Sequence, residues 1–313
     1  MKGFAFQRFK LVSLSAAVLA VGASTGFIST AVASAAGGTL NGAGSTLVAP
    51  LAVEWASAWN SKTGNTVNYN PVGSGTGIAD ISAGTVDFGA SDAPLSPTQA
   101  AGCHSCIQIP WALSATGIGY NVPGAGHKLH LTGSLLAQIY QGHITNWNDP
   151  SIARVNKGVH LPNLTITPVF RSDGSGDTYA FTNYLTHISP SWARSIGTGT
   201  SVSFPKGASG KGNSGVTAVL QGTPGSVAYI AVSYLIAHQL PAVAIQNAAG
   251  KFEYPNLSNI ENAAAVVKHV PANNALSIVD PPKSAKIAYP ISTFTYAIVP
   301  HGAKQAGLLK QFI

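Results

Sequence analysis

Charged residues are scarce in this sequence of 313 residues. Asp, Glu, Lys and Arg together make up 9% of it, against roughly 25% in average proteins. No cluster of Lys and Arg interleaves with aromatic residues, which argues against nucleic acid as a partner. Hydrophobic residues make up 45% of the chain, enough for a substantial core. A charged residue that is clustered or follows a buried strand is therefore a candidate functional residue.

Cysteine is nearly absent, and the two that occur, Cys103 and Cys106, stand in the stretch GCHSC. In a cytosolic protein this spacing is typical of a redox or zinc site, whereas in an exported chain it predicts a local disulfide. Zinc would need two further ligands, and besides His104 no second cysteine pair or H-x-x-x-H signature is present. We therefore expect a disulfide, no metal and no cofactor.

Sequence signatures of catalysis are also missing. The nearest approach to a phosphate-binding P-loop, GASGKGN, fails on spacing and has no Ser or Thr after its lysine. Beyond the first 36 residues, the nucleophile-elbow pattern G-x-S-x-G does not occur. Asp173 and Asp177 could imitate a catalytic carboxylate pair, but their proximity to Arg171 favours structural roles. The sequence therefore predicts a binding protein and not an enzyme.

The N-terminus has the pattern of a secretory signal peptide, assigned to residues 1–36. Basic residues precede an apolar stretch from Leu11 to about Ala23, and Ala-x-Ala cleavage sites end at Ala33 or Ala35. The alternative, an uncleaved membrane anchor, would need a longer and less interrupted apolar run. Three of the 17 basic residues lie in this signal, so the mature chain has 14 basic and 10 acidic residues. We expect export to the periplasm or the extracellular cell surface.

The rest of the chain alternates apolar strand patterns with helical ones, which indicates an α/β protein with parallel sheets. Three Gly/Ser turns each follow a strand and open a helix: GAGST, GSGTG and DGSGDT. The first of these helices is expected from Thr46 onward. Ligands of open α/β sheets bind at the edge where the strands have their carboxyl ends. The three turns therefore predict one binding edge.

The stretch RSDGSGDT, residues 171–178, suggests which ligand binds there. A helix N-terminus offers unpaired N–H groups and partial positive charge, and glycines let the backbone approach a ligand. Arginine offers a planar fork of donors that matches tetrahedral oxyanions. The stretch is interpreted as an anion site; the alternative for it alone is a capped surface turn.

Four stretches carry a family resemblance: NGAGSTLVAPLAVEWASAW, VNYNPVGSGTGIADISAGTVDFGASDAPLS, FRSDGSGDTYAFTNYL and SFPKGASGKGNSGV. From about Thr39 to its end, the chain resembles the substrate-binding component of the phosphate-specific ABC transporter, the PstS family. The resemblance implies an α/β, two-lobed periplasmic binding protein (type II) with a ligand cleft between the lobes and strand hinges. Lobe 1 would comprise residues 39–116 plus 293–313, and lobe 2 residues 117–292.

The hinges would lie near residues 117–122 and 289–295. Family members run further at the C-terminus, so the resemblance also implies that lobe 1 is truncated there. Its ligand would be inorganic phosphate, and its partners the ABC permease and ATPase subunits of the importer. The alternatives kept open are a phosphatase-like hydrolase and an extracellular adhesion protein on the same scaffold.

The resemblance implies phosphate contacts for these residues: Ser45, Thr46, Leu47, Ser74, Asp92, Arg171, Ser175, Gly176 and Asp177. Thr46 and Ser74 would donate from hydroxyl and N–H groups, and Leu47 from its N–H. Asp92 would accept a proton of the bound phosphate, unless it only caps the turn before Pro94.

Within the octapeptide, Arg171 would make the one charge-assisted contact, and Asp173 would fix its guanidinium. Ser175 and Gly176 would give N–H donors at the helix start. Asp177 stands where the family commonly has threonine, and a carboxylate there would repel phosphate. We expect Asp177 to turn outward and cap the helix. Thr178, one position out of register, could supply the missing hydroxyl.

Overall fold

A mixed sheet of eight strands runs through the part of the chain that the structure describes, residues 37–103, 105–126 and 128–313 of this computed structural model. The predicted signal peptide, residues 1–36, lies outside the described residues. None of the described helices is both long enough and apolar enough to cross a membrane.

The strands are β1 (Thr39–Gly44), β2 (Thr66–Asn70), β3 (Phe88–Ser91), β4 (Ile107–Asn121), β5 (His130–Leu131), β6 (Thr167–Arg171), β7 (Ala208–Gly210), β8 (Ser226–Ala231), β9 (Ala244–Gln246), β10 (Phe252–Glu253) and β11 (Ser292–Val299). The helices are α1 (Ala49–Thr63), α2 (Ser74–Ser82), α3 (Pro97–Gly102), α4 (Gly133–Tyr140), α5 (Pro150–Val155), α6 (Gly176–Ile188), α7 (Pro190–Ser195), α8 (Gly212–Gly222), α9 (Val232–Ala237), α10 (Leu257–Ala264) and α11 (Ala306–Phe312).

The strand order in the large sheet is β2-β1-β3-β11-β4-β8-β6-β7, and β10-β9-β5 form a small second sheet. The outer strands pair in parallel, β1 with β2 and β3, and β6 with β7 and β8. The central pairs β3–β11, β11–β4 and β4–β8 are antiparallel. The prediction of parallel sheets is therefore wrong for the centre, because two long strands there run against their neighbours.

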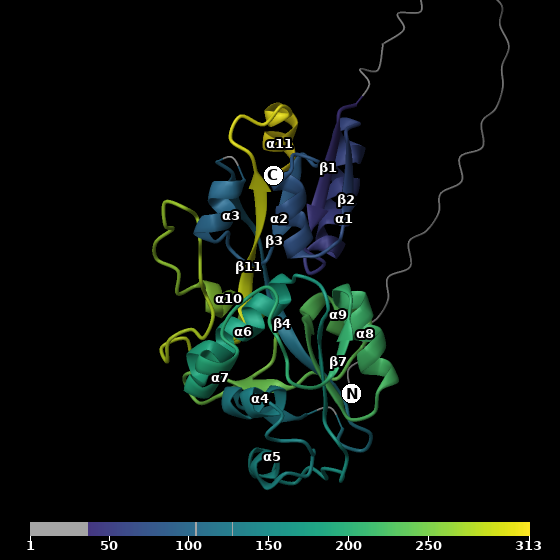
Figure 1. Ribbon diagram of the computed structural model, residues 1–313, viewed down its shortest axis with the longest axis vertical. Helices are drawn as coiled ribbons and strands as arrows, with labels where there is room; N and C mark the ends of the chain where they lie inside the picture. Colours follow the sequence, from purple (N-terminus) through teal and green to yellow (C-terminus); the bar gives the residue numbers. More distant parts are fainter. Residues whose placement is uncertain (1–36, 104, 127) are drawn as a thin grey trace, which may run out of the picture. The chain divides into compact units, whose positions relative to one another are not determined.

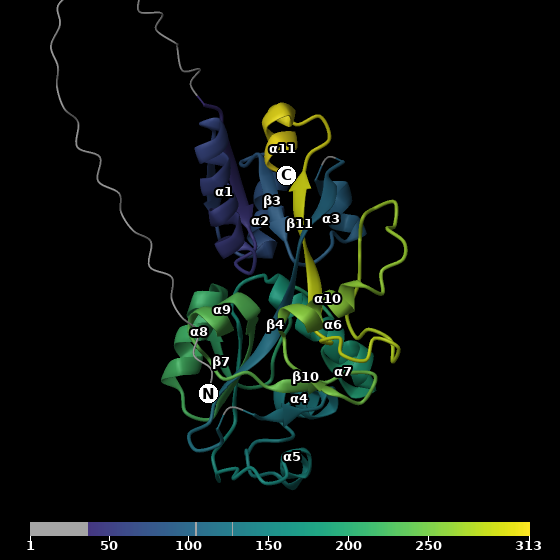
Figure 2. The same ribbon diagram turned by 180° about the vertical axis from the view of Figure 1, so that it is seen from behind.

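Strands β4 and β11 join the two halves of the sheet and run side by side between the upper and lower groups of elements in Figures 1 and 2. Residues 107–115 of β4 pair with β11, whereas residues 116–121 pair with β8. The partner of β4 thus changes between Ala115 and Thr116, just before the predicted hinge at 117–122. We use the predicted boundaries to name lobe 1 (residues 39–116 and 293–313) and lobe 2 (residues 117–292).

Each half of the sheet has its own aromatic core. In lobe 1 the ring of Phe88 lies 5.9 Å from that of Trp111 and 5.8 Å from that of Phe312 in the last helix, centroid to centroid. In lobe 2 the ring of Phe181 lies 4.7 Å from those of Tyr140 and Tyr229. Burial of large apolar surfaces on both sides of the sheet is the main force that holds these elements together.

Local signals in the sequence account for where several helices begin. Pro50 occupies the first turn of α1, where its missing N–H costs little, but the helix begins at Ala49 and not at the predicted Thr46. Ser96 and Gln99 form a reciprocal capping box at the start of α3. Just after this helix, Cys103 and Cys106 are joined by a disulfide.

A segment of lobe 2, residues 271–278, reaches over to lobe 1 and lies beside α3 in Figures 1 and 2. The Gln108 side chain donates to the Asn273 carbonyl at 2.7 Å, and Asn274 donates from Nδ2 to the Gln108 carbonyl at 2.9 Å. The hydroxyl of Tyr296 accepts from the N–H of Leu276 at 3.1 Å and donates to its carbonyl at 2.8 Å. The 271–278 segment therefore ties lobe 2 to both crossing strands.

Tyr296→Phe is expected to lower the free energy of unfolding by about 1–3 kcal/mol, because it leaves the N–H and carbonyl of Leu276 without their buried partner. Urea unfolding followed by circular dichroism measures this loss. Tyr179→Phe is the control, since the Tyr179 hydroxyl makes no hydrogen bond to any residue that the structure describes. Equal stability of Tyr296→Phe and wild type would show that the segment is not held through this hydroxyl.

Candidate functional site

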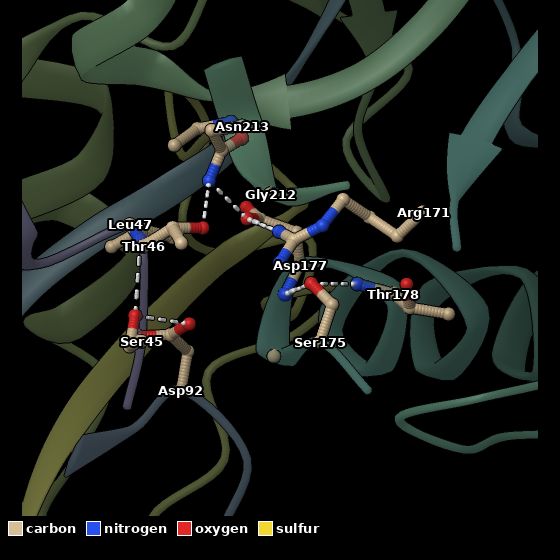
Figure 3. Close-up of polar contacts among 12 residues, drawn as sticks. Ser45, Thr46, Leu47, Asp92, Arg171, Ser175, Asp177, Thr178, Gly212 and Asn213 are labelled. Carbon is tan, nitrogen blue, oxygen red and sulfur yellow. Dashed lines mark hydrogen bonds and ion pairs between the residues drawn. The ribbon is translucent and has the colours of Figure 1, made fainter. Parts of the chain in front are cut away.

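Three Gly/Ser turns converge on one place between the lobes, and Figure 3 shows residues of the first and the third. The first follows β1, the second opens α2, and the third lies between β6 and α6. Asp92 follows β3 directly, and a fourth contribution comes from the start of α8 after β7. Strands β1 and β3 are parallel neighbours in one half of the sheet, and β6 and β7 in the other, so their carboxyl ends present these turns together.

The buried guanidinium of Arg171 is the positive centre of the site. Its Nε donates to Oδ1 of Asp173 at 2.7 Å, and its Nη2 pairs with Oδ2 of the same carboxylate. Its Nη1 lies 3.2 Å from Oδ2 of Asp177. Burial lowers the pKa of Arg171, but the bond to Asp173 and the charges of both carboxylates outweigh it and leave the pKa raised. These two are the ion pairs found among the described residues, and Arg171 takes part in both.

Asp173 holds the guanidinium in one orientation. Its Oδ1 also accepts from the N–H of Gly212, at 2.9 Å. Burial raises the pKa of Asp173, but the hydrogen bond and charge of Arg171 prevail and hold it below its ordinary value. Asp173 is therefore ionised and can fix the fork of donors that faces the site.

Asp177 does not turn outward, and the expectation that it caps the helix is wrong. Its side chain is 1% exposed and points into the site, where Oδ2 accepts from Asn213 at 2.8 Å and Oδ1 from Thr116 at 2.8 Å. The cap is Ser175, whose hydroxyl oxygen accepts from the N–H groups of Asp177 and Thr178. Burial raises the pKa of Asp177, and Arg171, Asn213 and Thr116 oppose that rise.

Asp92 is a second buried carboxylate in the site, and unlike Asp177 it is not paired with Arg171. Its Oδ1 and Oδ2 accept from the Ser45 hydroxyl at 2.6 and 2.7 Å, and Oδ2 lies 3.4 Å from the Ser74 hydroxyl. Burial raises the pKa of Asp92 to about 7, helped by the charge of Asp177 and opposed by the bond from Ser45, the charge of Arg171 and the bond from Ser74. Asp92 can therefore change protonation state near neutral pH.

The turn after β1 places Ser45, Thr46 and Leu47 side by side. The Ser45 oxygen accepts from the N–H of Leu47 at 3.0 Å while its hydroxyl donates to Asp92, so Ser45 is engaged by the protein itself. The hydroxyl oxygen of Thr46 accepts from Asn213 at 2.9 Å. The N–H of Leu47, predicted as a ligand donor, thus donates to Ser45 in this structure.

The N–H donors predicted at the start of α6 have different partners. The N–H of Ser175 donates to the Thr200 carbonyl at 2.8 Å, because the chain is extended at this cap residue. The N–H of Gly176 donates across the lobes to the Ser74 hydroxyl at 3.1 Å. The α6 N-terminus therefore lies in the site with Gly176 and Asp177 as its first residues.

Close backbone approach makes glycine necessary on both sides of this interface. A Cβ on Gly176 would lie 2.4 Å from the Cβ of Asp92, and one on Gly73 would lie 2.4 Å from Oδ2 of Asp173. Gly73 also has φ of +94°, which side chains disfavour. Next to it, the N–H of Gly75 donates to the Gly174 carbonyl of the opposite lobe at 3.0 Å. The glycines allow the charged groups of one lobe to reach those of the other.

Sequence reasoning missed Thr116, Asn213 and Tyr229, all buried here. Tyr229 accepts from the N–H of Arg171 at 2.9 Å and bonds the Thr178 hydroxyl at 2.8 Å, so Thr178 does not supply a free hydroxyl to the site. Asn213 lies in GKGNSG, part of a stretch that carries the family resemblance and fails as a P-loop, but the resemblance implied no ligand contact for it. Thr116 and Tyr229 lie in apolar strands, where no local pattern marks them as functional.

The arrangement suits the binding of an oxyanion. It combines one buried guanidinium, hydroxyl groups, backbone N–H groups and the N-terminus of a helix of 13 residues. Over the described residues, no three His, Cys, Asp or Glu side chains gather as metal ligands would. The Ser45 hydroxyl donates to the carboxylate of Asp92, and no histidine takes part in the contacts described for this site.

Comparisons with known proteins place the chain in a family. Residues 29–313 match the model of the PBP superfamily domain. The chain is 39% identical over 277 residues to the phosphate-binding protein PstS of Xylella fastidiosa (strain Temecula1), over 87% of this chain and 74% of that protein. It is 42% identical over 228 residues to the phosphate-binding protein PstS of Pasteurella multocida, over 72% of this chain and 66% of that protein.

Solved structures agree on the fold. A high-affinity periplasmic phosphate-binding protein (PfluDING) bound with phosphate aligns with a TM-score of 0.70 and 22% identity, over 88% of this chain and 84% of that one. A phosphate ABC transporter substrate-binding protein from Clostridium perfringens, described as putative in its name, aligns with a TM-score of 0.64 and 19% identity, over 88% and 90%. The predicted two-lobed periplasmic binding-protein fold is confirmed, and the chain belongs to the PBP superfamily and, within it, to the family of the phosphate-binding protein PstS.

Proposed function

We propose that this protein binds inorganic phosphate outside the membrane and delivers it to an ABC permease for import. The observation that carries the proposal is the buried guanidinium of Arg171, held by Asp173 beside the N-terminus of α6. A rigid planar fork and a helix N-terminus that meet in a dry site suit a tetrahedral oxyanion. The names of the relatives, phosphate-binding proteins, support the same ligand.

The contacts proposed for phosphate come from both lobes. Lobe 1 would contribute the turn of residues 45–47, the Ser74 hydroxyl and Asp92. Lobe 2 would contribute Arg171 and the α6 N-terminus at residues 175–177. Support comes from the hydrogen bonds that already bring these groups together, such as the 3.1 Å bond from Gly176 to Ser74. Phosphate oxygens would take over donors that now bond to serine and aspartate oxygens.

Delivery to a permease would require the lobes to open and close. Residues 39–116 with 293–313, and residues 117–292, are proposed as the two moving bodies, with β4 and β11 as hinges. The change of partner along β4 at residues 115–116 supports a hinge there. The permease and ATPase subunits are proposed as partners, and the periplasm or cell surface as location, from membership of the PstS family.

Isothermal titration of the purified mature protein with phosphate tests the proposed function. We expect saturable binding of one phosphate per chain and no release of product from a chromogenic phosphate ester. If neither phosphate nor any other oxyanion gives a heat of binding, the proposal is overturned and a scaffold or adhesion role is favoured. Turnover of the ester would instead favour the hydrolase.

Arg171→Ala is expected to weaken phosphate binding by about 1.5–3 kcal/mol, the usual contribution of a charged hydrogen bond. Titration calorimetry measures the change, after circular dichroism has confirmed the fold, because the variant leaves the carboxylates of Asp173 and Asp177 without their partner. Arg194→Ala, on the exposed face of α7, is the matched control and should bind as wild type does. An unchanged dissociation constant for Arg171→Ala would refute its role.

Asp92→Asn is expected to weaken the preference for phosphate over sulfate. An ionised carboxylate accepts from the O–H of phosphate, whereas sulfate has no proton to offer. Because the pKa of Asp92 is about 7, the wild-type preference should be largest near pH 8 and fall below pH 6, where the protonated acid can donate to sulfate.

Competition titrations at both pH values measure this preference. The Asp92→Asn variant should show a smaller preference, and a smaller change of that preference between the two pH values, since its amide donates at both. Asp80→Asn, on α2, is the control. If the variant keeps the wild-type preference at pH 8, Asp92 has only its structural role at the turn.

A further inference from the structure

Asn213, the second residue of α8, is fully buried and makes three hydrogen bonds, of which Figure 3 shows those to Thr46 and Asp177. Its Oδ1 accepts from the N–H of Ala231 at 2.9 Å. Its Nδ2 donates to Oδ2 of Asp177 at 2.8 Å and to Oγ1 of Thr46 at 2.9 Å. Because a backbone N–H can only donate, Ala231 fixes the orientation of the amide, and both of its hydrogens face the site.

We propose that Asn213 is a positioning residue for anion binding, which makes the carboxylate of Asp177 compatible with a phosphate ligand and sets the hydroxyl of Thr46 as a donor. The inference rests on the proposed function, since it concerns the same ligand. It adds a residue to which neither the sequence motifs nor the predicted ligand contacts assigned a role.

The first effect concerns charge. Asp177 lies one residue from Gly176 at the α6 N-terminus, where its carboxylate would repel an anion. Arg171, Thr116 and Asn213 together supply three donors to its two oxygens, at 3.2, 2.8 and 2.8 Å. A carboxylate whose lone pairs are engaged by fixed donors presents less negative charge to a ligand. Asn213 and Arg171 both contact Oδ2 of Asp177, and Asn213 is the uncharged donor of the two.

The second effect concerns direction. A threonine hydroxyl has one hydrogen and can accept as well as donate. In Thr46 one lone pair of the hydroxyl oxygen accepts from Nδ2 of Asn213, which turns the hydroxyl so that its hydrogen can bond a ligand. A phosphate oxygen is an acceptor, so this orientation suits it. Since Thr46 belongs to lobe 1 and Asn213 to lobe 2, the arrangement forms only when the two lobes meet.

The first test is Asn213→Ala, with phosphate affinity measured by titration calorimetry at pH 8. Loss of a hydrogen bond to a charged group predicts a dissociation constant about 10- to 100-fold larger. The matched control is Asn156→Ala. Asn156 is equally a buried asparagine with three hydrogen bonds, to His130 and Ile152, but it lies outside the site. The control should lose stability and keep the wild-type affinity.

The second test, Asn213→Asp, separates positioning from a general loss of packing. The new side chain has nearly the same size and keeps an oxygen for Ala231, so it preserves the fold if the alanine variant does not. Its carboxylate would face Asp177 and remove both donors. Phosphate binding should be at least 10-fold weaker than wild type near pH 8 and should recover toward wild type at pH 5, as the added acid is protonated.

The outcomes are distinct. If wild-type protein binds no phosphate, the proposed function fails and this inference with it. If wild type binds and Asn213→Ala binds within twofold of it, only the inference is overturned. Only the inference is overturned, too, if the dissociation constant of Asn213→Asp divided by that of wild type is the same at pH 5 and pH 8. Weak binding of Asn213→Asp at pH 8 with recovery at pH 5, and an unaffected Asn156→Ala, would support it.

Discussion

The site depends on one interaction, the buried contact of the Arg171 guanidinium with the carboxylates of Asp173 and Asp177. A buried charge without a partner is costly, and removing one member of a buried pair typically destabilises a protein by about 3–5 kcal/mol. Asp173 orients the fork, and Asp177 contacts it from the other side. In a chain with only 10 acidic residues, this concentration of charge has a function to serve. An oxyanion is the ligand that such a centre can hold.

The remaining polar groups form a network in which each member fixes the next. Ser45 engages both oxygens of Asp92, Ser74 accepts from Gly176, and Asn213 joins Thr46 to Asp177. Most of these bonds link residues far apart in the sequence, and two of them, Gly176 to Ser74 and Asn213 to Thr46, cross between the lobes. Fully satisfied buried networks of this kind hold side chains in one arrangement. The proposed ligand site is therefore held in one arrangement where the lobes meet.

The sheet explains how two halves of the chain can present one site. Parallel strands on each side end at the same interface, so the turns that follow them face one another. Two antiparallel strands, β4 and β11, pass between the halves and keep them in register. The 271–278 segment adds hydrogen bonds from lobe 2 to both of these strands. In the proposed opening and closing, these connections would keep the two halves aligned.

The sequence by itself determined the α/β class, the three Gly/Ser turns and the importance of the octapeptide at residues 171–178, because these depend on local periodicity and on the backbone freedom of glycine. The family resemblance added the prediction that the chain folds into two lobes. Only the tertiary structure decided that the centre of the sheet is antiparallel, that Asp177 faces inward, and that Asn213 and Thr116 are its partners. From its neighbours in the sequence, Asp177 could equally be a helix cap, but in the structure Ser175 is the cap. Its inward position is favoured by donors that lie 36 and 61 residues away in the chain, which no local pattern can reveal.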